Sequence, residues 1–158
     1  MTSEKRKDFA RRISQANKTE LVAVTYDIII ENIDCSINSL EEGNIPEYRA
    51  ELKSAQRMLG ELMRSLDFKY PISKDLLNIY EYVQRKLVAS DVSGEDRGLG
   101  EIRGILSRLG GAFAKIAGQD NSGSVMENTQ QIYAGLTYGK GVLNEADMGA
   151  GTNRGFLA

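Results

Sequence analysis

The chain has 158 residues, a formal net charge of −2, 41% hydrophobic and 27% charged residues, a balance that is typical of one globular domain. The near-neutral charge gives no argument for nucleic-acid binding. No run approaches the ~18 consecutive apolar residues of a membrane helix. The charged first residues are not followed by the apolar segment of a secretory signal. Histidine is absent and Cys35 is the only cysteine, which excludes the usual zinc sites, histidine-dependent catalysis and an internal disulfide. We therefore expect a cytoplasmic protein with no metal, cofactor or enzyme activity.

The first predicted helix begins after Asn17 and ends before Gly43. Asn17 and Glu20 have the spacing of a capping box, in which each side chain accepts a hydrogen bond from the backbone N–H of the other residue. Apolar residues then recur on one helical face, namely Val22, Ile29, Ile33, Ile37 and Leu40. Gly43 suits the left-handed position that commonly ends a helix.

Three further amphipathic helices follow, beginning near Asn44, Pro71 and Leu99. Their apolar seams have spacings of three and four residues, and consist of Tyr48, Leu52, Ala55, Leu59, Leu62 and Leu66; of Leu76, Tyr80, Val83 and Leu87; and of Leu99, Ile102, Leu106, Leu109, Phe113 and Ile116. Four such helices with short links predict an all-α fold, an antiparallel up-down four-helix bundle. In the last helix, Gly100 and Gly104 indicate either marginal stability or a smooth flank where another backbone lies close.

The second and third predicted helices carry more apolar residues than a bundle interior requires. A bundle helix needs about three apolar positions in seven, yet Met58, Met63 and Leu77 lie outside the seams. This surplus indicates either a wider core contact or a groove that accepts an amphipathic helix of another protein. The residues that we predict to line such a partner-binding groove are Met58, Leu62, Met63, Leu76, Leu77, Tyr80, Val83 and Leu87.

Two segments lie outside the predicted bundle, which spans residues 17–118. Residues 1–16 are an N-terminal arm, in which Phe9 and Ile13 are spaced to fold back onto the bundle and cap the groove. Residues 119–158 are a glycine-rich C-terminal extension that we expect to be extended or partly helical. Ser124 begins the pattern of a short fifth helix, with Met126, Tyr133 and Leu136 on one side.

Four stretches of the sequence, in order, resemble motifs of the FliS family of flagellin export chaperones. Ile72–Leu87 is similar to the third-helix signature I-S-x-N-L-x-x-L-Y-x-Y-M-x-R-R-L, and Glu20-Leu21 with Tyr26-Asp27 is similar to E-L-x-x-M-L-Y-D-G. Glu41–Asn44 is similar to the E-x-G-D turn, and Gln56–Asp67 to the motif A-Q-x-x-x-x-E-L-x-x-S-L-D. The stretches cover about residues 17–117.

The resemblance implies a cytoplasmic bundle that binds the C-terminal segment of flagellin, prevents its premature polymerisation and delivers it to a component of the flagellar type III export gate. It also implies that the client lies on apolar grooves of the second to fourth helices, and that the N-terminal segment covers part of this site when no client is bound. Phe9 and Ile13 stand where the family has Tyr and Val, and no match exists after about residue 119.

Two other functions remain open from the sequence. A surplus apolar face is also what a self-associating structural bundle needs for a homodimer interface. A cluster of basic residues in the arm is a candidate for phosphate contacts, and comprises Lys5, Arg6, Lys7, Arg11 and Arg12. Because the chain as a whole is acidic, we expect neither nucleic-acid binding nor membrane insertion.

Overall fold

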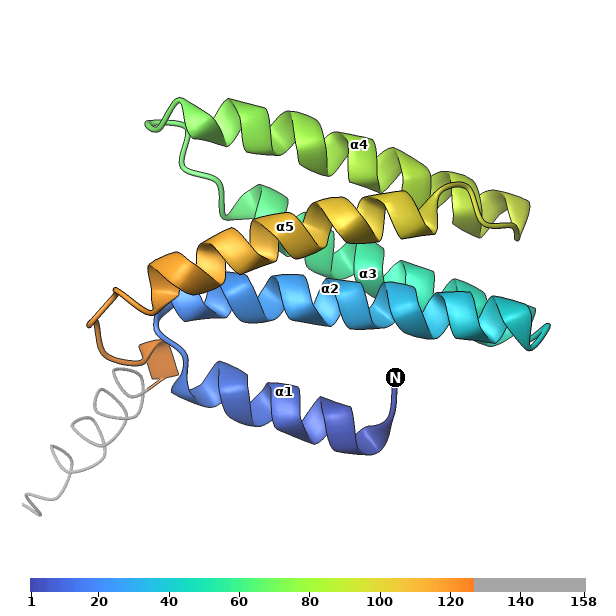
Figure 1. Cartoon of the computed structure of the whole chain (residues 1–158), viewed down its shortest axis with the longest axis horizontal. Coiled ribbons are helices and arrows are strands. Elements are labelled where there is room, and N and C mark those ends of the chain that lie inside the picture. The colour runs from blue at the N-terminus through green and yellow to red at the C-terminus, as the bar shows by residue number, and fades with distance from the viewer. Residues whose placement is uncertain (127–158) are drawn as a thin grey trace, which may run out of the picture.

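The computed structural model of the chain describes residues 1–126, which form five helices and no strand. The helices are α1 (Ser3–Gln15), α2 (Lys18–Glu41), α3 (Ile45–Arg64), α4 (Ile72–Ser93) and α5 (Leu99–Ala117). Successive helices from α2 to α5 run in opposite directions, so they form the antiparallel bundle that the sequence predicts (Figure 1). The expected fifth helix of the C-terminal extension, apart from its first residues, lies outside the described part of the chain.

The predicted start and end signals of α2 are present in the structure. The Asn17 side chain accepts a hydrogen bond from the backbone N–H of Glu20 at 2.8 Å, and the Glu20 carboxylate accepts one from the Asn17 N–H at 2.9 Å, which completes the capping box. After α2, Gly43 has a φ of +72°, a left-handed conformation that a side chain with a Cβ disfavours. These local contacts fix where the first bundle helix begins and ends.

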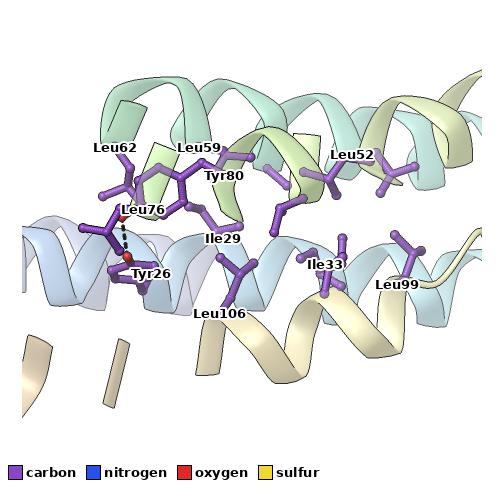
Figure 2. Packing of buried hydrophobic residues seen from close by; sticks show 14 of the residues in the cluster. Tyr26, Ile29, Ile33, Leu52, Leu59, Leu62, Leu76, Tyr80, Leu99 and Leu106 are labelled. Atoms are coloured by element: carbon purple, nitrogen blue, oxygen red, sulfur yellow. Dashed lines mark hydrogen bonds between the residues drawn. The ribbon is translucent and has the colours of Figure 1, made fainter. Parts of the chain in front are cut away.

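The core lies between the four bundle helices, with α2 packed most extensively against α3 and α5 and with α4 packed mainly on α3. Figure 2 shows the seam side chains of all four helices pointing toward one another, among them Tyr26, Ile29, Ile33, Leu52, Leu59, Leu62, Leu76, Tyr80, Leu99 and Leu106. The spacing of three and four residues read from the sequence therefore identifies the interior face of each helix.

Gly110 allows α5 to approach α2 closely. A Cβ added at this residue would lie 2.9 Å from the Cβ of Tyr26, closer than two carbon atoms pack without displacement. At Gly100 and Gly104, an added Cβ would have no neighbouring atom of residues 1–126 within 4 Å. The close backbone approach in this helix is therefore at Gly110, six residues beyond Gly104.

The N-terminal arm is a helix, α1, and this helix lies along α2 on the side of the bundle away from α4 (Figure 1). Its first turn is capped by the Thr2 side chain, which accepts from the Lys5 N–H at 3.3 Å. An ion pair between Arg11 and Asp8, three residues apart, joins two turns at 2.8 Å. None of the residues of α1 is fully buried.

Candidate partner-binding surface

Five of the eight residues predicted to line the groove belong to the interior of the bundle. Leu62, Leu76, Tyr80, Val83 and Leu87 each expose less than a tenth of their surface and form part of the hydrophobic core. The physical reason is their spacing, because they continue the inward-facing seams of α3 and α4. In this structure these five side chains lie beneath the surface of the bundle and are not accessible to a partner.

Tyr80 shows how completely this seam is enclosed. Its hydroxyl hydrogen-bonds the hydroxyl of Tyr26 inside the core, as the dashed line in Figure 2 shows. Burial raises the pKa of both phenols above the usual value. The pair therefore stays neutral at physiological pH, and because one hydroxyl donates to the other, each has a hydrogen-bond partner in an apolar environment.

The other three predicted residues, Met58, Met63 and Leu77, are half-buried and reach the surface. Met58 and Met63 pack against the core from α3, while Leu77 lies on α4. Along α4 the exposed Val88 and Val92 follow Leu77 at spacings of eleven and four residues, which places all three on one outward stripe. This stripe is the exposed part of the apolar surplus in α4.

A second exposed apolar group was missed by the sequence analysis. Phe68, Tyr70 and Ile72, in and just after the turn between α3 and α4, are each more than half exposed, with values of 55%, 63% and 64%. The available signal was their position beside Pro71, outside both helical seams. The end of the bundle at this turn therefore carries apolar side chains that no part of residues 1–126 covers.

Two ion pairs join α1 to the bundle. Lys5, Phe9, Arg12 and Ile13 recur at spacings that place them on one face of α1. Lys5 donates to Glu31 at 2.5 Å and Arg12 donates to Asp27 at 2.6 Å, both across to α2.

The two apolar residues of this face, Phe9 and Ile13, are half-buried. The hydrogen bond to Glu31 raises the pKa of Lys5, which keeps that side chain charged. The helix that carries Phe9 and Ile13 contacts α2 and lies on the side of the bundle away from α4, which carries most of the predicted groove residues (Figure 1).

Two grooves flank α1, each with a volume of about 410 Å³. The hinge groove, at the end of α1, is lined by Arg12, Gln15, Ala16, Glu20, Ala23, Val24, Ala114, Ala117 and Gly118. The α3 groove, at the start of α1, is lined by Met1, Arg6, Ile28, Asn32, Glu51, Ser54, Arg57 and Met58. At this end the amino group of Met1 forms an ion pair with Glu51, a carboxylate that is 4% exposed.

We call the strip of α2 beneath α1, together with the two flanking grooves, the α1-covered face. It combines the carboxylates of Asp27 and Glu31 with apolar side chains such as Val24 and Ile28, and Met58 reaches it from α3. A surface of this kind suits an amphipathic helix that has cations along its margins. In this structure α1 is that helix.

Comparison with known families accounts for most of the chain. The family described as Flagellar protein FliS matches residues 1–120, which include α1 and the whole bundle. The chain belongs to the FliS family of flagellar export chaperones. The resemblance seen in the sequence motifs is thereby confirmed.

Residues 121–158 lie beyond the FliS match. A search of the curated proteins found no match. In the described part of the chain, no helix has the length and hydrophobicity needed to cross a membrane.

Proposed function

We propose that this FliS-family protein is a cytoplasmic chaperone that binds the C-terminal segment of flagellin, prevents its premature polymerisation and delivers it to a component of the flagellar type III export apparatus. The observation that carries the proposal is the FliS match over residues 1–120, which spans α1 to α5. The α1-covered face is the surface that we propose for the client.

The packing of α1 supports this assignment. No residue of α1 is fully buried, and its exposed ion pair between Arg12 and Asp27 contributes only about 0–1 kcal/mol. The buried ion pair between the Met1 amino group and Glu51 is a further contact that a client has to replace. An amphipathic client segment that brings more apolar surface gains roughly 25 cal/mol for each additional Å² that it buries. We infer that such a segment replaces α1 on α2.

The client contact continues beyond α1 in this proposal. Met58 already lines the α3 groove, and we propose the half-buried Met63 of α3 and Leu77 of α4 as further client contacts. Flexible methionine side chains adapt to clients whose apolar residues do not repeat perfectly. The buried residues Leu76 and Tyr80 hold the shape of this surface.

The test is a polymerisation assay followed by light scattering. Purified flagellin is induced to polymerise with and without the protein at equal concentration. We expect suppression that saturates at a stoichiometric ratio, and no complex with flagellin that lacks its C-terminal segment. Unaltered polymerisation at a molar excess of the protein would contradict the proposal.

The alternative function is a structural bundle that self-associates. The exposed side chains of Phe68, Tyr70 and Ile72 favour it, since such a group is typical of an interface. Analytical ultracentrifugation distinguishes the two functions. A stable dimer that does not bind a flagellin C-terminal peptide would support self-association, and a monomer that binds the peptide would support the chaperone.

A further inference from the structure

The chain that follows α5 returns to the joint between α1 and α2. We call residues 119–125 the strap, and the joint consists of Ala16 and Asn17, the two residues that separate the helices. The Val125 N–H donates to the carbonyl oxygen of Ala16 at 3.0 Å. The Asn17 amide group donates to the carbonyl oxygen of Asp120 at 3.1 Å. Both joint residues are thus held by the strap, and both are buried.

The second residue of α2, Thr19, is held as well. The Thr19 hydroxyl donates to the Asp120 carboxylate at 2.6 Å. This hydrogen bond is the main reason that the pKa of Asp120 is lowered, and a hydrogen bond from Ser122 assists it. Ser124, at the other end of the strap, contacts the carbonyl oxygen of Ser14 in the last turn of α1 at 3.5 Å. The strap therefore spans from α2 across the joint to α1.

Movement of α1 away from α2 requires rotation of the backbone at the joint, because no other residue separates the two helices. The carbonyl at the end of a helix has no partner within the helix, so the Val125 N–H satisfies a group that would otherwise need water. Rotation at Ala16 moves this carbonyl away from Val125 and breaks the bond. A seated strap thus opposes the opening of α1.

We propose that the strap is an autoinhibitory clamp, which holds α1 against α2 while it is seated and frees α1 when it is displaced. The contacts to Ala16 and Ser14 come from Val125 and Ser124, which lie beyond the FliS match. The two hydrogen bonds to Asp120, by contrast, involve the last residue of the match. A binding event that displaces the strap makes the opening of α1 more favourable. By linkage, opening of α1 makes release of the strap more favourable by the same free energy.

The clamp is tested in the full-length chain by hydrogen–deuterium exchange of the α1 amides. Val125→Pro removes the N–H, and proline is favoured here because Val125 is the first residue of a helical turn. Val125→Ala keeps the N–H and is the matched control. Thr19→Val removes the hydroxyl, and Thr19→Ser keeps it.

Loss of one hydrogen bond corresponds to about a fivefold change in an opening equilibrium. We therefore expect exchange in α1 to rise about fivefold in Val125→Pro and in Thr19→Val, with exchange in α3 and α4 unchanged. Equal α1 exchange in Val125→Pro and Val125→Ala would overturn the clamp. Equal acceleration in α1, α3 and α4 would overturn it too, because it would show a general loss of stability.

The consequence for client capture rests on the proposed function and is measured separately. If α1 and the flagellin segment share the α1-covered face, Val125→Pro binds a flagellin C-terminal peptide more tightly than Val125→Ala by the same factor. Faster α1 exchange with no gain in peptide affinity would support the clamp and contradict the shared face.

Discussion

Arg12 is the residue of α1 whose charge should control how often the α1-covered face is open. It donates to Asp27 of α2 at 2.6 Å, and both side chains are well exposed, at 38% and 46%. Replacement of Arg12 by Glu removes this attraction and adds a repulsion of similar size. For exposed pairs each contribution is about 0.2–1 kcal/mol, so α1 should be destabilised on α2 by about 0.4–2 kcal/mol.

This change corresponds to a factor of about 2–30 in the opening of α1. The apparent dissociation constant of a client equals its intrinsic value divided by the fraction of open protein. If α1 is closed most of the time, the affinity for a flagellin C-terminal peptide should therefore rise by about 2–30-fold. Isothermal titration calorimetry at low salt measures this directly, and the gain should shrink near 1 M salt, where the Debye length is only about 3 Å.

Arg11→Glu is the matched control for net charge. Arg11 pairs with Asp8 within α1 and does not reach α2. Its replacement changes the charge of the helix equally without breaking the contact between the helices. A rescue variant, Arg12→Glu with Asp27→Arg, restores an ion pair of reversed polarity and should return the hydrogen–deuterium exchange of α1 toward the original. Equal affinity of Arg12→Glu and Arg11→Glu would refute the reasoning.

Three other predictions concern the bundle and its surface. Gly110→Ala should lower the free energy of unfolding by about 1–3 kcal/mol because its Cβ overlaps Tyr26. Gly111→Ala should raise it by about 0.8–1 kcal/mol, because an added Cβ there meets no atom of the described residues within 4 Å. Urea denaturation that ranks the two variants in the opposite order would disprove the close approach. Leu77→Asp should weaken binding of the flagellin peptide in calorimetry and leave the helical circular dichroism unchanged, and unchanged binding would remove Leu77 from the client surface. Asn17→Ala should cost about 0.5–2 kcal/mol in the same denaturation experiment, since it removes the cap of α2, and a neutral effect would argue against the capping box.

The helices of the bundle could be predicted from the sequence because their signals are local. The capping box at Asn17, the proline near the start of α3 and the left-handed Gly43 each act within a few residues. The seams repeat at three and four residues, which is the period of the helix itself. The seam positions of Tyr80 and Leu87 place both side chains in the core, although we predicted from the sequence that they line the groove.

The candidate surface could be predicted only in part, because it depends on contacts between residues that are distant in the sequence. Lys5 and Glu31 are 26 residues apart, and nothing in their spacing indicates that they pair. The sequence of α1 offers only Phe9 and Ile13 as large apolar residues of one face, too few to show which helix they contact.

The close approach of α5 could not be located from the sequence, where Gly100 and Gly104 indicated either marginal stability or a smooth flank. A glycine at a helix contact looks the same in a sequence as a glycine that faces water. Only the arrangement of α5 against Tyr26 distinguishes Gly110. The strap is also a long-range feature, since Val125 and Ala16 come together through the whole bundle.

The most direct test of the account is hydrogen–deuterium exchange of the full-length protein with and without a saturating flagellin C-terminal peptide. We expect the amides of α1 to lose protection when the peptide binds, while the amides of α2 from Ala23 to Asn32 remain protected. A bound peptide that leaves the protection of α1 unchanged would contradict the claim that client and α1 share one face. The absence of any complex at high peptide concentration would contradict the proposed function itself.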